Sequence, residues 1–388
     1  MEELIRAMMN LIAGEVCGKA IDRARGAFSK EETLQLYKLS KAHDLAHLVG
    51  NALIKNDLID DNEIRAKFQK QTMLAVYRYE TINYELDCLR RVLNEAQILF
   101  IPLKGSVLRQ YYPEPWMRTS CDIDILVQES DLERAVAVLR EKLSYREEAK
   151  GPHDIGLFSE SGVHLELHYS LVEANRVQKI ESVLQSVWEG ATPVSGTSEY
   201  LLSDEMFYYY HIAHMAKHFV VTGGCGVRPF LDIWVLNHHV SHDPEARRAL
   251  LAQGGLLTFA AEAKTLSEVW FGEGEHTDLT RQMQDFLLRG GAYGTTQNRV
   301  AVQQVRRGGK VRYALSRIWL PYEILKYRYP SLCGKRILLP LYEIRRWFAL
   351  AFGTSAKRSI SELKFNSSMT GAEQAKTGEM LSKLEIDQ

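Results

Sequence analysis

Three acidic residues in this 388-residue chain have the types and spacing of a metal site. Asp122 and Asp124 are separated by one residue in the apolar segment DIDILV, and Glu166 lies in the alternating segment VHLELH. Side chains alternate across a strand, so Asp122 and Asp124 are expected to share one face. Carboxylates are the usual protein ligands of Mg²⁺, and a third acid from a neighbouring strand can complete a two-metal site. The three acids therefore suit metal-dependent nucleotidyl transfer.

A glycine turn before the acids is a candidate for holding phosphate groups. Lys104, Gly105 and Ser106 follow the apolar run ILFIPL and come before a segment expected to be helical. Glycine lets the backbone approach a phosphate, and a helix N-terminus offers free N–H groups. Lys104 and Arg118 are the nearest cations able to meet a triphosphate. We predict that Lys104, Gly105, Ser106 and Arg118 bind the nucleotide, and that Asp122, Asp124 and Glu166 are catalytic and hold Mg²⁺ (or Mn²⁺), with Glu166 as ligand or general base.

The elements that must position these residues form an α+β arrangement. A short apolar run, a second strand and two alternating segments (153–158 and 163–168, expected as a hairpin) predict a small mixed β-sheet, with helical periodicity on both sides. The polar end of the chain predicts a tail. The predicted units are an N-terminal helical region (1–95), a nucleotidyltransferase core (96–190), a C-terminal helical domain (191–365) and a mobile tail (366–388).

Composition excludes several classes of protein. The chain is 46% hydrophobic and 25% charged with a formal net charge of -1, so no overall field selects a nucleic acid or a membrane. Five scattered cysteines form no C-x-x-C pair, which indicates free thiols rather than disulfides or zinc. Without a signal-peptide pattern or a long apolar run, we predict a cytoplasmic protein with no stable membrane insertion.

A histidine-bearing helix adds further candidates. His211, His214 and His218 share one face of a helix expected to start after Ser203. Zinc has little support, because no fourth ligand stands at a recognised spacing. Two alternatives stay open: a face turned toward the nucleotide, with His214 and Lys217 contacting substrate, and plain packing against neighbouring tyrosines.

Arg228 and Asp232 are spaced i, i+4 and also admit two interpretations. They could form an intrahelical ion pair, worth roughly 0.2–0.5 kcal/mol. Alternatively, one of them orders the active site. The residues predicted as possible substrate contacts are His168, His214, Lys217, Arg228 and Asp232.

Residues 306–346 form a basic stretch with eleven Lys and Arg against two Glu, and with interleaved aromatic residues. Such a pattern can bind nucleic-acid phosphates and stack bases. It equally fits solvated helix faces with aromatic side chains in a core. The short apolar segment at 337–341 could touch a membrane surface, although a buried helix is the favoured interpretation.

The segment 104–127, KGSVLRQYYPEPWMRTSCDIDILV, resembles the minimal nucleotidyltransferase signature of the polymerase-β-like superfamily. More narrowly, the chain resembles the bacterial uncharacterised nucleotidyltransferase family, whose members show a K-G turn, a Y-P segment, an arginine and a D-x-D-x-L-V strand. An acid two residues before a histidine, a histidine-bearing helix and an arginine-to-aspartate helix follow. Residues 166–168, 211–218 and 228–232 match these. The similarity spans about residues 40–350.

The resemblance implies a nucleotidyltransferase fold with helical flanks, Mg²⁺ dependence and an NTP donor such as ATP. The predicted reaction moves an NMP to an acceptor hydroxyl or phosphate and releases pyrophosphate. The alternatives are a toxin-type tRNA nucleotidyltransferase, a catalytically silent antitoxin-like protein that binds a partner and, more remotely, a kinase-like phosphoryl transfer. The acceptor (peptide, protein, small molecule or tRNA), the preferred base and the oligomeric state stay open.

Overall fold

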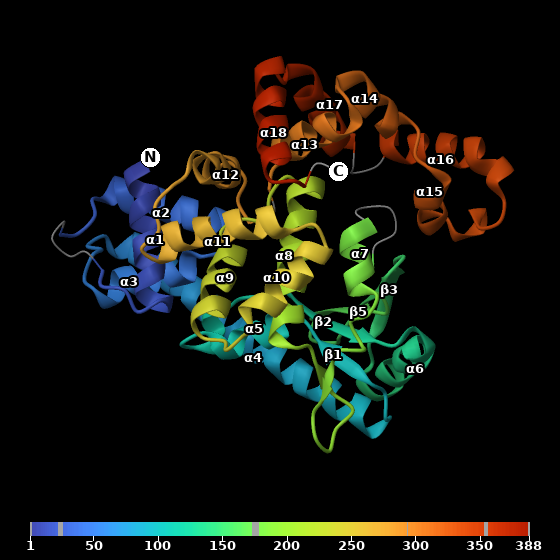
Figure 1. Cartoon of the computed structure of the whole chain (residues 1–388), viewed down its shortest axis with the longest axis horizontal. Coiled ribbons are helices and arrows are strands. Elements are labelled where there is room, and N and C mark those ends of the chain that lie inside the picture. The colour runs from blue at the N-terminus through green and yellow to red at the C-terminus, as the bar shows by residue number, and fades with distance from the viewer. Residues whose placement is uncertain (1, 22–25, 173–177, 293, 353–355, 387–388) are drawn as a thin grey trace.

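The computed structural model is mostly helical, with a small sheet set among the helices (Figure 1). It describes residues 2–21, 26–172, 178–292, 294–352 and 356–386. The arrangement confirms the predicted α+β class, because helices come before and after a small mixed sheet. Among the described residues, no helix combines the length and the apolar character that crossing a membrane requires.

Helices come before the sheet in the described chain, as the helical periodicity predicted. They are α1 Glu2–Val16, α2 Lys30–Ala42, α3 Ala46–Lys55 and α4 Asn62–Glu95. Ser29 starts α2 with a capping box, in which its side chain and that of Glu32 each accept a backbone N–H bond. The long α4 runs beneath the sheet in Figure 1 and delivers the chain into the first strand.

The main sheet of the described chain has five strands in the order β1-β2-β5-β4-β3. β2 and β5 are parallel, and the other neighbouring pairs are antiparallel. The strands are β1 Phe100–Pro102, β2 Asp122–Val127, β3 Arg146–Lys150, β4 Asp154–Phe158 and β5 His164–His168. The predicted hairpin is confirmed as β4 and β5. The shorter elements nearby are α5 Gly105–Leu108, α6 Leu132–Leu143, α7 Gln178–Leu184, β6 Thr192–Pro193 and β7 Tyr200–Leu201.

Alternation along β2 separates the two faces of the sheet. Ile123 and Ile125 are fully buried and belong to a core shared with apolar side chains of α4 and α6. Leu126 points the other way and belongs to the larger core of the helical regions. Asp122 and Asp124 share the parity of Leu126, so they face the helices rather than α4 and α6.

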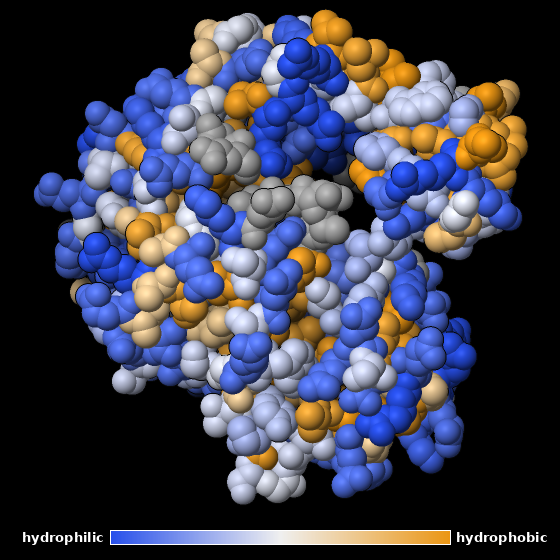
Figure 2. Space-filling view, turned by 45° about the vertical axis from the view of Figure 1, so that its right-hand side comes forward, coloured by the Kyte–Doolittle hydropathy of each residue, from blue (hydrophilic) through white to orange (hydrophobic). Residues whose placement is uncertain are grey.

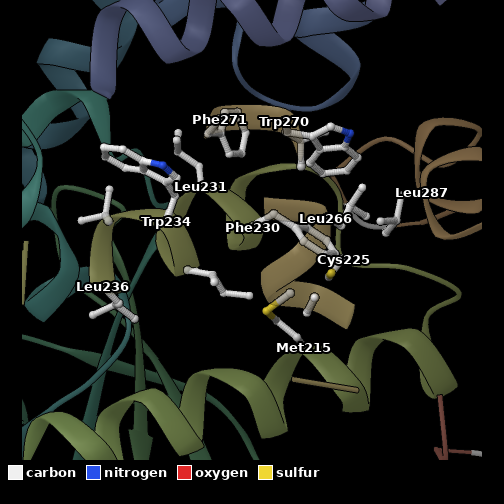
Figure 3. Packing of buried hydrophobic residues seen from close by; sticks show 14 of the residues in the cluster. Met215, Cys225, Phe230, Leu231, Trp234, Leu236, Leu266, Trp270, Phe271 and Leu287 are labelled. Atoms are coloured by element: carbon white, nitrogen blue, oxygen red, sulfur yellow. The ribbon is translucent and has the colours of Figure 1, made fainter. Parts of the chain in front are cut away.

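The helical regions before and after the sheet share one hydrophobic core. The later helices that contribute to it are α8 Asp204–Val221, α9 Arg228–His238, α10 Pro244–Gln253, α11 Leu257–Phe271 and α12 Asp278–Leu288. Figure 3 shows part of this core, where aromatic side chains of α9 and α11 pack together. Phe230 and Trp270 meet edge to face with ring centroids 5.0 Å apart, a favourable geometry for aromatic rings. Apolar side chains of α8 belong to the same core, which fixes this helix among its neighbours.

The last part of the chain is also helical. Its helices are α13 Thr296–Arg307, α14 Lys310–Ile318, α15 Tyr322–Arg328, α16 Leu339–Phe352, α17 Ala356–Ser368 and α18 Gly371–Lys383. The segment predicted as a mobile tail contains α18, which begins with a capping box at Thr370 and buries Met380 and Leu381. Although this segment is polar in composition, α18 carries an apolar stripe that packs against the helical core.

Candidate active site

The structure brings the three predicted acids together. Asp124 lies opposite Glu166 in the parallel register of β2 and β5, and Asp122 lies two residues earlier on the same face. These three residues, here called the acid cluster, line a cavity of about 930 Å³. The same cavity is lined by further residues singled out from the sequence: Lys104, Gly105, Arg118, His168, His214, Lys217, Arg228 and Asp232.

The ammonium group of Lys104 lies among the carboxylates. Its Nζ atom is 2.6 Å from Oδ1 of Asp124 and 3.6 Å from Oε2 of Glu166. Lys104 has a φ of 44°, uncommon for a residue other than glycine, at the turn from β1 into α5. Burial opposes the charged form, but the neighbouring carboxylates, Asp124 foremost, raise the pKa of Lys104 well above its usual value. Lys104 is therefore a cation that neutralises part of the acid cluster.

His168 extends the acid cluster. Its Nε2 atom is 3.1 Å from Oδ1 of Asp124 and 3.5 Å from Oε2 of Glu166. Burial opposes protonation, but hydrogen bonds to these two carboxylates raise the pKa of His168 overall. Asp124, Glu166 and His168 offer ligand atoms that all lie within 4.8 Å of one another. The sequence assigned His168 to the substrate, whereas the structure places it with the acids as a further candidate metal ligand.

The two aspartates of β2 respond in opposite ways to this environment. Burial and the negative charge of Asp124 raise the pKa of Asp122. Burial also opposes ionisation of Asp124, but Lys104 and His168 hold the pKa of that carboxyl well below its usual range. The acid cluster thus contains a carboxylate whose charge the protein does not balance. Since Mg²⁺ and Mn²⁺ prefer such oxygen ligands, these residues fit a divalent cation.

The glycine turn is shaped by close packing. A Cβ atom at Gly105 would lie 3.3 Å from Cβ of Ser120, in the segment that enters β2. The following helix, α5, is only four residues long, so its N-terminus is a weak site for phosphate. The hydroxyl of Ser106 is buried without a hydrogen-bond partner among the described residues, and Ser106 does not line the cavity. The predicted nucleotide contact of Ser106 therefore has no support in the geometry.

Arg118 is held by a protein carboxylate. Its Nε and Nη2 atoms donate to Oδ1 and Oδ2 of Asp232 at 2.6 and 2.9 Å, and the hydroxyl of Tyr112 donates to the same carboxylate at 2.7 Å. Asp232 is fully buried. Burial opposes its charge, but Arg118 lowers the pKa of Asp232. Bidentate pairing engages the guanidinium, so we do not assign Arg118 to the triphosphate, as the sequence had suggested.

Arg228 and Asp232 do not pair with each other, so the interpretation as an intrahelical ion pair is wrong. Arg228 donates to Oδ2 of Asp44 at 3.0 Å and to the carbonyl of Thr119 at 2.7 Å. Arg228 therefore bonds residues from distant elements instead of Asp232, its neighbour one turn away on the helix. Arg118, Asp232, Arg228, Asp44 and Tyr112 are here called the buried network, which fixes the segment leading into β2.

The histidines of α8 are divided between two roles. His211 is bonded through Nε2 to the carbonyl of Pro229 at 2.9 Å and is buried. His214 and His218 lie side by side at 3.2 Å between their Nε2 atoms, and both line the cavity with Lys217. Burial, followed by the positive charge of Lys104, lowers the pKa of His214 well below its usual value. Within the described chain these histidines join no group of three ligands, so zinc gains no support.

The sequence analysis missed other residues of the cavity wall. His153 and Asp154 lie at the start of β4, where Asp154 faces His168 in the antiparallel register, and the three form a second group of close ligand atoms. Lys179 reaches the cavity from α7. The predicted hairpin contained a signal for the first two, because it places the start of segment 153–158 beside the end of segment 163–168, where His168 lies. No local signal pointed to Lys179.

Comparison with known proteins agrees with this geometry. A family model described as "Uncharacterised nucleotidyltransferase" matches residues 29–272, more than half of the chain, and ends before the limit of about residue 350 predicted from the sequence. No curated protein matches the chain. Among solved structures, the chain is similar to the Thermotoga maritima CCA-adding enzyme in complex with tRNA, at 13% identity over 81% of this chain and 85% of that chain. The TM-score is 0.22, too low to carry an argument.

Proposed function

The chain belongs to the uncharacterised nucleotidyltransferase family, and from this premise we propose that it moves an NMP from an NTP to an acceptor hydroxyl or phosphate, with release of pyrophosphate. The observation that carries the proposal is the acid cluster at the cavity. Its carboxylates come from two adjacent parallel strands, so a rigid sheet fixes their spacing. Phosphoryl transfer is accelerated mainly by charged groups that the protein holds in position before the reaction.

We assign the metal site to Asp122, Asp124 and Glu166, with His168 as a further candidate ligand. When bound, Mg²⁺ or Mn²⁺ would neutralise charge on the phosphate oxygens as pyrophosphate leaves. Lys104 holds the carboxylates in place through its contacts with Asp124 and Glu166. Its ammonium is the cation closest to the acid cluster in the described chain, so it is proposed to contact the triphosphate as well.

The opposite wall of the cavity comes from α8 and is proposed to bind substrate. Lys217 brings a positive charge suited to a phosphate. His214 is neutral at pH 7, because its pKa is lowered by burial and by nearby cations. A neutral imidazole interacts with substrate through hydrogen bonds rather than through charge. This wall therefore suits an acceptor or sugar with hydroxyl groups beside the anionic donor.

Arg228 and Asp232 are proposed as positioning residues rather than substrate contacts. Arg118 and Arg228 both bond the carbonyl of Thr119, three residues before Asp122. Anchoring this carbonyl fixes where the segment enters β2 and hence where Asp122 lies. The antitoxin-like alternative expects a cavity blocked by helices, whereas the volume of about 930 Å³ beside three intact acids supports an enzyme.

The test of the proposed function follows two phosphorus labels. The protein is incubated with Mg²⁺, with each NTP labelled at the α- or the γ-phosphate, and with separated protein, RNA and small-molecule fractions of a cell extract. We expect the α-label to pass to an acceptor and the γ-label to appear in pyrophosphate. Transfer of the γ-label with release of NDP would replace the proposal with phosphoryl transfer. Glu166→Gln should abolish transfer, while Asp87→Asn, an exposed acid on α4, should not.

A further inference from the structure

The helices after residue 309 expose apolar side chains that globular proteins usually bury. Among the described residues, eleven of the eighteen large hydrophobic side chains that are exposed lie between positions 311 and 348. Residues 310–348, here called the arm, comprise α14, α15 and most of α16 and form the lobe at the upper right of Figure 1. Figure 2 shows hydrophobic residues gathered on this lobe. The favoured interpretation of segment 337–341 as a buried helix is wrong, because Ile337 is 92% exposed.

The most informative element of the arm is α16, in which charged side chains are buried and apolar side chains are exposed. Glu343 and Arg346 are 2% and 4% exposed and form an ion pair at 2.7 Å. Leu341, Ile344 and Phe348 lie on the other side and are 61%, 54% and 62% exposed. A helix on the surface of a globular protein buries its apolar stripe and exposes its charges. The reversed order indicates that the apolar face of α16 has a partner outside the chain.

Helix α14 also exposes an apolar face beside α16, although its arginines are exposed as well. Val311, Leu315 and Ile318 recur at i, i+4 and i+7, share one face and are exposed. The carbonyl of Ile318 accepts hydrogen bonds from Arg346 at 2.6 Å and from the indole of Trp347 at 3.0 Å. Polar contacts thus fasten the two helices to each other, and the apolar faces of both stay on the outside. An extended surface results, rather than scattered single residues.

The charge of the arm indicates what that partner is. The arm carries nine Lys and Arg against Glu323 and Glu343, a charge of +7, so the remainder of the chain carries -8 of the net -1. Both glutamates are already paired, Glu343 with Arg346 and Glu323 with Lys326 and Arg336. Such a dipolar molecule orients its basic side toward an anionic surface. A second copy of the chain is disfavoured, because it would bring two basic arms together.

We propose that the arm docks on the surface of an anionic lipid bilayer. The arm combines basic residues, an exposed aliphatic face and the exposed Trp319 and Trp347, and this combination binds headgroups and buries side chains at the acyl boundary. RNA would use the cations and the aromatic rings but would leave Leu341, Ile344 and Val311 without a role. The helices of the arm are short and lie on the bilayer rather than spanning it. The docking proposal rests on the arm alone and does not depend on the proposed transfer reaction.

The test is co-sedimentation of the full chain with vesicles of phosphatidylcholine alone or mixed with phosphatidylglycerol. We expect binding to the mixed vesicles only, weakened by added salt. Lys335→Gln with Arg336→Gln should reduce binding roughly tenfold or more. Leu341→Ser with Phe348→Ser should reduce it to a similar degree, while Met73→Ser with Tyr84→Ser, equally exposed on α4, should leave it unchanged.

Several outcomes would overturn the proposal. These are no binding to either vesicle, or equal binding by the arm variants and the α4 control. Binding of tRNA that is lost in the Lys335 and Arg336 variant but kept in the Leu341 and Phe348 variant would assign the arm to RNA. A dimer in sedimentation equilibrium that the Leu341 and Phe348 variant abolishes would assign it to a second copy. All the substituted side chains are solvent-exposed, so circular dichroism should show an unchanged fold.

Discussion

Two groups of charged side chains lie along the same cavity and are built in opposite ways. In the buried network, Asp232 meets Arg118 in a bidentate pair with Tyr112 as a further donor, and Arg228 meets Asp44. In the acid cluster, the ammonium of Lys104 contacts Asp124 and Glu166, and burial and the negative charge of Asp124 raise the pKa of Asp122.

The difference distinguishes charged groups that hold the fold together from charged groups suited to bind a ligand. A buried charge that is paired within the protein destabilises the fold when its partner is removed, and its hydrogen-bonding atoms are already engaged. A carboxylate whose charge the protein leaves unbalanced, facing a cavity, costs folding free energy, and this is the pattern expected of a group that binds a ligand. Substitutions in the acid cluster should therefore lower transfer activity, whereas substitutions in the buried network should lower the free energy of unfolding.

The largest effect is expected from Asp122→Asn. Transfer activity should fall by roughly 10⁴-fold, which corresponds to about 5 kcal/mol. The variant should nevertheless be as stable as the native chain or more stable, because the raised pKa of Asp122 means that its charge opposes folding. Activity with α-labelled NTP and urea unfolding measure the two quantities. A variant that loses stability while keeping activity would assign Asp122 to the structural group.

The opposite result is expected from Asp232→Asn. The lowered pKa of Asp232 means that its charge stabilises the fold, so its loss should cost about 3–5 kcal/mol in urea unfolding. Arg118→Met combined with Asp232→Leu removes both charges and should regain most of this loss. If the single variant is stable but cannot bind NTP, Asp232 belongs to the active site instead.

A smaller effect, dependent on pH, should come from His47, which anchors the same region by bonding the carbonyl of Met117 at 2.9 Å. Burial lowers its pKa to about 4 from an unfolded value of 6.5. As pH falls from 6.5 toward 4, the unfolded chain takes up a proton that the folded chain does not, so stability is lost.

Between pH 7 and pH 5 this residue should cost the fold about 2 kcal/mol. His47→Gln can keep the hydrogen bond to Met117 without titrating, so its urea unfolding should change less between the two pH values. An equal change in the native chain and the variant would show that His47 does not protonate on unfolding in this range.

The smallest effect is expected from Lys104→Met, which tests whether Lys104 and Mg²⁺ compete for the same carboxylates. In the native chain the ammonium lies between Asp124 and Glu166, where it competes with an added cation. Lys104→Met should lower the thermal midpoint in chelator, and Mg²⁺ should restore more stability to it than to the native chain. At tenfold excess over its dissociation constant, Mg²⁺ should contribute about 1.4 kcal/mol. An identical response of both proteins to Mg²⁺ would place the cation elsewhere.

Local patterns in the sequence were sufficient for the acid cluster. The period of two along DIDILV placed Asp122 and Asp124 on one face, and the hairpin pattern placed Glu166 on a strand of the same sheet. Both inferences use neighbours within a few residues, where backbone geometry dictates which side chains share a face.

The buried network and the arm could not be predicted in this way. Arg118 and Asp232 are 114 positions apart, and Arg228 and Asp44 are 184 apart, so no local spacing connects them. The i, i+4 spacing of Arg228 and Asp232 suggested a pair that tertiary partners displaced. The basic stretch 306–346 was interpreted as solvated helix faces with a core of aromatic side chains or as a nucleic-acid surface, and its composition carries no information on which face turns outward. Burial of Glu343 beside exposed Leu341 is decided by packing alone.

The most direct test of the acid cluster is calorimetric titration with ATP, CTP, GTP and UTP, each with and without Mg²⁺. It compares the native chain, the Asp122→Asn, Asp124→Asn double variant and the Asp87→Asn control. We predict saturable binding of at least one NTP that requires Mg²⁺, persists in the control and is lost in the folded double variant. Binding that is unaffected by the double variant, or no binding of any NTP by the native chain, would contradict a metal–nucleotide site at the acid cluster.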